Sequence, residues 1–325
     1  MRSYWMQVSD GGAVLELRET PQPEPGPGQI LLRVHAAALN RGEFIAGHGL
    51  HGKPGARQIG IECAGEVAAL GAGVTQVKSG QRVMGRCPAS FAEYAVMDVR
   101  EAIPVPDSVS WNEAGAIALV YQVAYDLLVL QGRLRAGEWV LINGAASGVG
   151  VASLQLAKYL GGKVAGTSGS PDKLARLREM GLDAALCTRR PDFYDGVMQA
   201  TGNAGVNVVV NNIGGSVFAE DLRCMAFEAR LGMVGYVDGQ LKGEVDIEAL
   251  HGKRLTLFGV SNKMRSAEHR AKTVPAFIKD MVPAFASGRI RPIVDQVFPF
   301  ERLEEAREHM QADRHLGKIV LEIAA

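Results

Sequence analysis

Residues 138–150 read EWVLINGAASGVG, and this stretch decides the fold because an apolar run ends in a tight turn of tiny residues. The turn opens at once into a helical pattern and then into a second apolar run, up to residue 166. A strand, a tight turn and a helix in this order let backbone N–H groups and the positive end of the helix approach a pyrophosphate. The fingerprint GxGxxG places Ala145, Ser147 and Gly150 at its glycine positions, so the flanking pattern, more than the letters, predicts a dinucleotide site.

The rest of the chain divides into two kinds of pattern. From Val140 onward apolar runs alternate with amphipathic stretches, which predicts parallel strands joined by helices on both faces of a sheet. The predicted strands are VLIN, KVAGTS, AALCT, VNVVVNNI, RLGMVGY and RLTLFGV. Up to about residue 100 the chain instead shows short β-type runs separated by Gly and Pro. We therefore predict an α/β protein with a doubly wound parallel sheet and a second, mainly-β domain.

Two features set the expected domain boundaries. Ser110 and Glu113 have capping-box spacing, which predicts a helix that begins there and runs on through residue 130. After Val260 the sequence predicts a helical region and a closing strand, GKIVLEI, that can return to the first domain. We expect the first domain at residues 1–120, completed by residues 262–325, and the dinucleotide-binding domain at residues 121–261.

The composition excludes several classes of function. A chain of 325 residues with 47% hydrophobic and 22% charged residues is typical of a soluble globular protein of two domains. The formal net charge is zero, which provides no field to attract nucleic acid or an anionic membrane. The four cysteines form no CxxC pair and indicate single thiols in a reducing compartment. Because no signal peptide or membrane span is evident, we expect a cytoplasmic protein without membrane partners.

The choice between NAD and NADP depends on the position roughly 20 residues past the first glycine of the fingerprint. Thr167 and Ser168 stand there in place of the acid of NAD enzymes, so a 2'-phosphate is not repelled and Lys173 can reach it. The alternative is that Ser170 caps the next helix and Lys173 is only solvated, and the two roles can coexist. Asp172 argues against NADP, although an acid in a first helical turn has its own electrostatic reason to be there. We predict NADPH.

Six motifs in order along the chain resemble those of the zinc-independent quinone oxidoreductases of the medium-chain dehydrogenase/reductase superfamily. They are AAALNRGE near residue 40, GIECAGEVAALGAGV at residues 60–74, SGQRVMG, NGAASGVG, VNVVVNNIGG and HLGKIVLEI. The resemblance implies a GroES-like first domain, a Rossmann second domain and a cofactor in the cleft between them. Residues 254–260 resemble the edge strand through which such proteins dimerise, which implies a homodimer; the alternative is that they form an ordinary strand of the sheet.

The resemblance implies that this chain lacks a zinc site. Asn40 stands where the superfamily's alcohol dehydrogenases have their first ligand, a Cys, and Ile61 stands where they have a His. Neither side chain replaces a thiolate or an imidazole in a tetrahedral site. Between Gly85 and Phe91 the only cysteine is Cys87, so a four-cysteine structural zinc lobe cannot form. We expect no metal, and we expect hydride transfer from NADPH to quinones or related α,β-unsaturated carbonyls, which need no Lewis acid.

Two residues are candidates for catalytic contacts. Asn40 resembles the family's pocket asparagine, able to hydrogen-bond a cofactor or substrate oxygen, and its alternative role is to satisfy buried backbone at a strand end. His51, or His48 in the same loop, stands in for the family's pocket Tyr, and an imidazole can donate a proton at neutral pH. The alternative for this histidine is simple solvent exposure. Glu43 occupies a position that is usually acidic in these enzymes, where a supporting hydrogen bond explains it as well as chemistry does.

The predicted cofactor contacts follow the ends of the predicted strands. They are Asn40, Ala146, Ser147, Gly148, Val149, Thr167, Ser168, Lys173, Asn212, Gly235, Tyr236, Val260, Ser261 and Arg314. Thr188 stands in place of a family Tyr near the adenosine phosphate, and Arg189 and Arg190 either supply charge there or lie in a solvated turn. Asn211 stands where relatives have Asp.

Three other functions share some of these features. A 2-enoyl thioester reductase has the same fold and would need a basic surface for the carrier's phosphates, which the sequence does not make evident. A nucleotide-binding sensor or structural protein with little turnover is compatible with the altered pocket residues. A short-chain dehydrogenase is excluded: Tyr159 and Lys163 have YxxxK spacing, but the lysine starts the next predicted strand, so the pair cannot face a nicotinamide.

Overall fold

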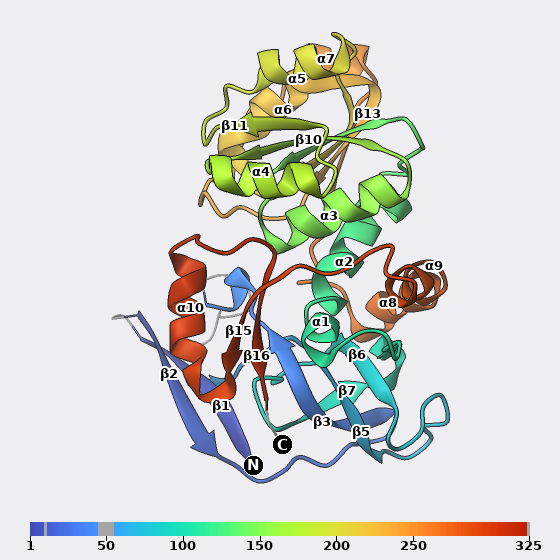
Figure 1. The fold of residues 1–325 in the computed structure, drawn as a ribbon, viewed down its shortest axis with the longest axis vertical. Helices are drawn as coiled ribbons and strands as arrows, with labels where there is room; N and C mark the ends of the chain where they lie inside the picture. The colour runs from blue at the N-terminus through green and yellow to red at the C-terminus, as the bar shows by residue number, and fades with distance from the viewer. Residues whose placement is uncertain (10–11, 45–54, 324–325) are drawn as a thin grey trace. The chain divides into compact units, whose positions relative to one another are not determined.

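The computed structural model describes residues 1–9, 12–44 and 55–323, which form two compact units (Figure 1). The first unit contains residues 1–119 and 262–325, and the second contains residues 120–261. Each unit has its own sheet and its own core. No helix in the described part of the chain is long and apolar enough to cross a membrane.

The second unit is built on a parallel sheet with strand order β11-β10-β9-β12-β13-β14, the doubly wound order of dinucleotide-binding folds. Its strands are β9 (Trp139–Asn143), β10 (Lys163–Ser168), β11 (Ala184–Cys187), β12 (Val206–Asn211), β13 (Met225–Met233) and β14 (Thr256–Gly259). Its helices are α3 (Gly148–Tyr159), α4 (Pro171–Glu179), α5 (Tyr194–Thr201), α6 (Phe218–Cys224) and α7 (Ile247–Gly252), with a short turn η4 (Gly215–Val217). Figure 1 shows α3 and α4 on one face of the sheet and α5 and α6 on the other. The predicted Rossmann-type sheet is confirmed.

Burial explains why these six segments are strands. The middle of β12, residues 208–210, is a run of three valines with no solvent exposure, because helices cover both faces of a parallel sheet. A continuous run of β-branched residues satisfies such a double-faced environment better than an alternating one. The apolar runs in the sequence therefore predicted both the strands and their burial.

The first unit is mainly β, as predicted. A seven-stranded sheet has the order β15-β16-β3-β5-β6-β8, with β7 also paired to β3, and a three-stranded sheet has the order β2-β1-β4. The strands are β1 (Arg2–Ser9), β2 (Gly12–Glu19), β3 (Gln29–Ala38), β4 (Gly55–Gln58), β5 (Glu62–Leu70), β6 (Arg82–Arg86), β7 (Tyr94–Asp98), β8 (Ile103–Pro104), β15 (Val294–Pro299) and β16 (Lys318–Glu322). The helical elements are η1 (Arg41–Glu43), η2 (Val99–Glu101), α1 (Trp111–Gly115), α8 (Ala267–Ala271), α9 (Val274–Ala286), η5 (Phe300–Arg302) and α10 (Leu303–Gln311).

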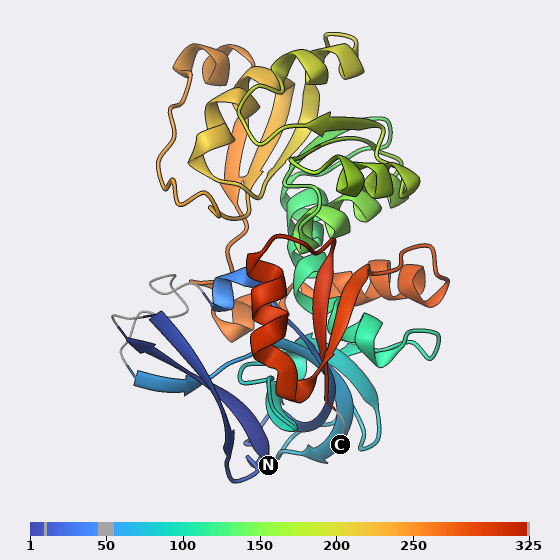
Figure 2. The same cartoon turned by 60° about the vertical axis from the view of Figure 1, so that its left-hand side comes forward.

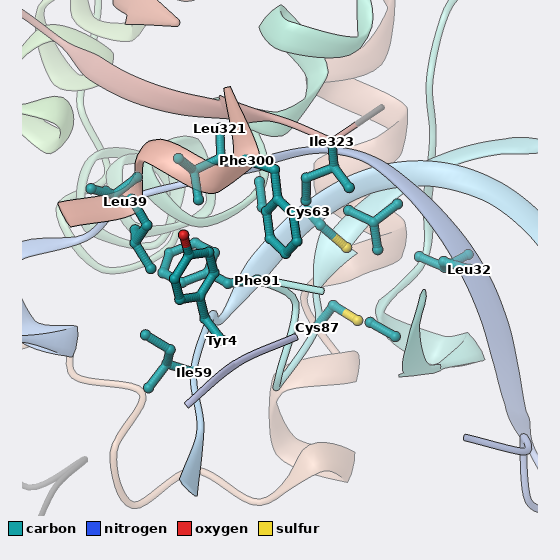
Figure 3. Close-up of a cluster of buried hydrophobic side chains, with 14 of the residues drawn as sticks. Tyr4, Leu32, Leu39, Ile59, Cys63, Cys87, Phe91, Phe300, Leu321 and Ile323 are labelled. Carbon is teal, nitrogen blue, oxygen red and sulfur yellow. The ribbon is translucent and has the colours of Figure 1, made fainter. Parts of the chain in front are cut away.

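The C-terminal segment belongs to the first unit. Strand β16 pairs antiparallel with β3, so that Val320 lies opposite Ala38. Figure 3 shows the rings of Tyr4, Phe91 and Phe300 gathered in the core of this unit. The Tyr4 and Phe300 rings meet edge to face with centroids 5.2 Å apart, a favourable geometry for aromatic pairs. In Figure 2 the helix α10 lies beside β15 and β16.

The prediction of one helix from Ser110 through residue 130 was wrong beyond its first turn. The capping box is present, since the Ser110 side chain accepts from the Glu113 N–H, but α1 ends at Gly115. A second helix, α2 (Ala118–Tyr125), follows and continues as a π-helical turn at Asp126–Gln131. The carboxylate of Glu62 accepts the Leu119 N–H at 2.7 Å, so a distant strand caps α2 as a new helix.

Candidate functional site

The turn between β9 and α3 has the geometry that a pyrophosphate requires. Ser147 is the N-cap of α3, and its Oγ accepts the Gly150 N–H at 3.1 Å. A Cβ added at Gly150 would lie 2.5 Å from the Gly144 carbonyl oxygen, so no other residue fits without displacing the turn. Residues 146–149 are partly exposed, whereas Ala145 and Gly150 are buried. The accessible N–H groups at the start of this 12-residue helix form a site suited to an anion.

A buried polar network fixes this turn from below. The Thr167 hydroxyl donates to Asn143 Oδ1 at 3.0 Å and accepts the Gly144 N–H at 3.2 Å. Asn143 Nδ2 donates to the Asp221 carboxyl on α6, and Asn211 Nδ2 donates to the same carboxyl at 2.8 Å. Burial raises the pKa of Asp221 well above its usual range, and the two asparagine hydrogen bonds oppose this shift. Because its hydroxyl is engaged here, Thr167 supports the turn.

The other predicted cofactor residues of this unit lie at the same edge of the sheet. Asn212 Nδ2 donates to the Asn143 carbonyl at 2.9 Å, at the point where strand order reverses between β9 and β12. Gly235 follows β13, and a Cβ there would come within 3.8 Å of the Asn212 carbonyl. The Val260 N–H donates to the Met233 carbonyl at 3.1 Å. Asn212 Oδ1 is buried and has no partner within the described residues, so an acceptor is available for a donor group of the cofactor.

Arg189, for which the sequence did not decide between a contact with the cofactor and a solvated turn, lies at the end of β10. A Cβ added at Gly169 would lie 2.2 Å from Arg189 Nε and 2.3 Å from its Cγ, so the Arg189 side chain lies across this glycine. The Thr188 N–H donates to the Ser168 carbonyl at 3.1 Å, which holds the two segments side by side. Ser170 caps α4 by accepting the Lys173 N–H at 3.4 Å. Ser168, the Lys173 N–H and the Arg189 side chain therefore lie near the end of β10, the strand end at which dinucleotide-binding folds recognise the ribose.

In the first unit, Asn40 belongs to a compact polar centre. Its Nδ2 donates to Glu62 Oε1 at 3.0 Å and to the Ala38 carbonyl at 3.3 Å. Lys318 Nζ, from the start of β16, donates to Asn40 Oδ1 at 2.7 Å and to Glu62 Oε1 at 2.9 Å. Asn40 itself is half-buried, so one side of this centre is accessible.

Glu43 lies beside this centre as a supporting residue. Its Oε2 accepts the Asn40 N–H at 3.2 Å, and the Glu43 N–H donates to the Asn40 backbone carbonyl at 3.0 Å. Burial raises the pKa of Glu43 to about 8, while the charge of Lys318 acts in the opposite direction. The carboxyl therefore holds its proton at neutral pH and orients Asn40 without adding a charge.

The remaining predicted residues are placed as follows. Arg314 is exposed in the segment after α10, in the first unit. His48 and His51 lie outside the described residues. Lys163 starts β10, and its Nζ lies 5.8 Å from the centroid of the Trp139 ring at the opposite end of the sheet from the glycine turn. The short-chain dehydrogenase pair is thus placed away from the nucleotide turn, as the sequence argument required.

Sequence reasoning missed Glu62, Lys318, Asn143 and Asp221 as members of these networks. Only Asp221 had a local signal in the sequence. Asn211 stands where relatives have Asp, and in the structure the carboxyl at this place comes from Asp221 of α6, which accepts a hydrogen bond from Asn211. Within the described residues no group of three His, Cys, Asp or Glu side chains could hold a metal ion.

Comparison with known proteins identifies the family. Residues 26–107 match the alcohol dehydrogenase GroES-like domain, and residues 148–279 match the family described as zinc-binding dehydrogenase. Quinone oxidoreductase-like protein 2 of Bos taurus is 29% identical over 311 residues, which cover 94% of this chain and 87% of that protein. The chain belongs to the medium-chain dehydrogenase/reductase superfamily. It is an oxidoreductase of the quinone oxidoreductase type, as the six motifs predicted.

Other relatives are much longer proteins. Highly-reducing polyketide synthase 1 of Aureobasidium melanogenum is 30% identical over 92% of this chain, but the match spans only 14% of that synthase. A component of the pikromycin polyketide synthase of Streptomyces venezuelae is 31% identical over 93% of this chain and 8% of that component. The chain therefore corresponds to one part of these synthases.

Two solved structures share the whole fold. A mycobacterial protein in complex with NADPH superimposes with a TM-score of 0.87 at 26% identity, covering 99% of each chain. An NAD-dependent alcohol dehydrogenase superimposes with a TM-score of 0.84 at 27% identity, covering 100% of each chain. The name of one structure includes NADPH and that of the other includes NAD. The choice between the two nucleotides in this chain therefore depends on its own residues at the end of β10.

Proposed function

We propose that this protein is an NADPH-dependent oxidoreductase that transfers hydride to quinones or related α,β-unsaturated carbonyls without a metal ion. The observation that carries the proposal is the polar centre around Asn40, where the Lys318 ammonium donates hydrogen bonds to both Asn40 and Glu62. An ammonium in that position repels Zn²⁺, and neither Asn40 nor Ile61 offers a zinc ligand. The acceptor must then be one that stabilises negative charge on its own oxygen by conjugation.

The residues of the second unit fit a dinucleotide. Bound NADPH would supply the hydride. Residues 146–149 and the start of α3 would hold the pyrophosphate, and the buried Asn212 Oδ1 offers an acceptor for an N–H or hydroxyl of the cofactor. Ser168, Lys173 and Arg189 favour a 2'-phosphate over a bare ribose, because they present donors and positive charge, whereas Asp172 in the first turn of α4 opposes it.

His51 is the proposed proton donor, and Asn40 is proposed to orient the reacting groups. A homodimer through β14, the edge strand of the second unit, and a cytoplasmic location are proposed with the same function. Light scattering should give a mass near twice the 34.7 kDa of the chain. The mass of a monomer would contradict the proposed homodimer.

A second candidate is a 2-enoyl thioester reductase. The 30% identity to a highly reducing polyketide synthase favours it over a binding protein without significant turnover, which is the third candidate. The first two candidates share cofactor, fold and hydride chemistry, and they differ only in the acceptor.

The deciding experiment follows NADPH oxidation with a panel of quinones, enones and enoyl thioesters, with NADH in parallel and metal analysis of the pure protein. Reduction of quinones or enones supports the proposal, and a strong preference for enoyl thioesters favours the second candidate. No reduction of any acceptor favours the binding protein. His51→Ala should lose turnover while His48→Ala retains it, and stoichiometric zinc would contradict the metal-free mechanism.

A further inference from the structure

Lys318 is buried in a place where lysine is rarely found. Its side chain is 5% exposed, and its partner Glu62 is fully buried. It is the first residue of β16, which pairs with β3 beside Asn40. Lysine is almost never buried without a partner, because desolvation of the ammonium is costly. Its presence here therefore calls for a role.

The ammonium is fully satisfied by three acceptors. Lys318 Nζ donates to the Leu39 carbonyl at 2.7 Å, to Asn40 Oδ1 at 2.7 Å and to Glu62 Oε1 at 2.9 Å. These bonds use all three of its N–H groups. The second carboxylate oxygen of Glu62 accepts the Leu119 N–H. The positive charge is thus fixed in position and balanced by one carboxylate.

The same bonds determine what Asn40 can do. Both N–H bonds of its amide are used, one to Glu62 and one to Ala38. Its Oδ1 accepts from Lys318 and retains one further lone pair. Asn40 can therefore accept a hydrogen bond from a ligand hydroxyl or amide, but it has no donor left for a substrate carbonyl. The sequence left open whether Asn40 donates a hydrogen bond to a substrate oxygen or accepts one from a ligand. Its contacts leave only the second role.

We propose that Lys318 is the positioning residue of this site: its fixed ammonium occupies the cation position of this donor set and holds Asn40 as a pure acceptor. The inference rests on the proposed function, since it assumes that Asn40 meets the cofactor or the acceptor. Zinc does not fit this donor set, because the cation position is already held by an ammonium in contact with the Glu62 carboxylate.

The test compares Lys318→Met, Asn40→Ala and the double variant, each measured for kcat and KM well below its melting temperature. Lys318→Met should lose roughly 10- to 100-fold in kcat/KM, the usual cost of losing a residue that orients a ligand-binding group. Adding Asn40→Ala to Lys318→Met should cost little more, because Lys318 acts through Asn40. Additive losses, or a wild-type kcat/KM in Lys318→Met, would overturn the proposal.

A matched control separates positioning from stability. Arg270 forms a buried ion pair with Glu101 in the same unit, at 2.8 Å. Arg270→Met should lower the melting temperature as Lys318→Met does, but it should leave kcat/KM unchanged. If Lys318→Met fails to fold, the double variant Lys318→Met/Glu62→Gln is used in its place. This double variant does not leave the Glu62 carboxylate buried without a partner.

The proposed function can fail independently. If the wild type binds NADPH but reduces no acceptor, the proposed function is wrong. The NADPH dissociation constant is then measured for the wild type, the two single variants and the double variant. Non-additive weakening by Lys318→Met and Asn40→Ala would still support the positioning role. An unchanged dissociation constant in both variants would overturn it.

Discussion

Removal of the Arg189 side chain should weaken NADPH binding and leave NADH binding unchanged. The side chain lies across Gly169 at the end of β10, next to Ser168. Charge-assisted hydrogen bonds are worth about 1.5–3 kcal/mol when well formed, and solvent exposure reduces this to roughly 1–2 kcal/mol here. Arg189→Ala should therefore raise the KM for NADPH by roughly 5- to 30-fold.

Gly169→Ala tests the same contact from the other side. A Cβ at residue 169 would overlap Arg189 Nε and Cγ, and the flexible side chain must move away. The substitution should therefore cost little stability yet raise the KM for NADPH in the same direction as Arg189→Ala. Agreement between the two variants would locate the effect at the guanidinium and not at the backbone.

The assay is steady-state turnover with NADPH and NADH at two salt concentrations. Arg190→Ala is the matched control, because Arg190 is also exposed and its backbone N–H, which the substitution retains, donates to Thr188 Oγ1. The NADPH effect should shrink at high salt, since an exposed charge pair is screened. An unchanged KM for NADPH in Arg189→Ala, or an equal rise for NADH, would refute the reasoning.

Three further substitutions test other parts of the structure. Gly150→Ala should lower the melting temperature by roughly 3–10 °C and weaken NADPH binding in a fluorescence titration, since the new Cβ meets backbone at 2.5 Å; Gly252→Ala, where a Cβ meets open space, is the control. Glu43→Gln should flatten the pH dependence of the melting temperature. The folded pKa of about 8 lies above the ordinary 4.5, so the native wild type keeps a proton that the unfolded chain has released, and wild-type stability falls as pH rises between these values; parallel melting curves would contradict this. Tyr159→Phe should leave kcat unchanged, because Tyr159 ends α3 away from the glycine turn, and a large loss in the chemical step would restore the short-chain mechanism.

The fold was largely predictable from the sequence because its signals are local. All six strands of the parallel sheet were recognised as apolar runs, since burial on both faces leaves such a run. Strand β15 was missed because only Phe298 of its six residues is buried, which gives no alternating pattern. The helix break after Gly115 was missed because its cause, the Glu62 carboxylate, lies 57 residues away in the sequence.

The polar networks were less predictable because their partners are distant. Lys318 meets Glu62 across 256 residues, and within its own segment it is only the first residue of an apolar strand. The family resemblance placed Asn40 at the site, yet only the three-dimensional contacts show that its amide hydrogens are already engaged. The sequence left Arg189 equally open as solvated or functional; the structure adds its contact with Gly169, and its role stays a prediction.

The two polar centres orient asparagines by the same means but differ in charge. In each centre a buried carboxyl accepts from asparagine amides: Asp221 from Asn143 and Asn211, and Glu62 from Asn40. Glu62 is balanced by the Lys318 ammonium, whereas burial raises the pKa of Asp221 and favours its neutral form. Because burial raises its pKa, Asp221 opposes the attraction of the helix N-terminus for a pyrophosphate less than an ordinary carboxylate in that position would. The charged pair beside Asn40 instead fixes its amide: Glu62 accepts from the amide nitrogen and the Lys318 ammonium donates to the amide oxygen, so that on the proposed function Asn40 meets a ligand only as an acceptor.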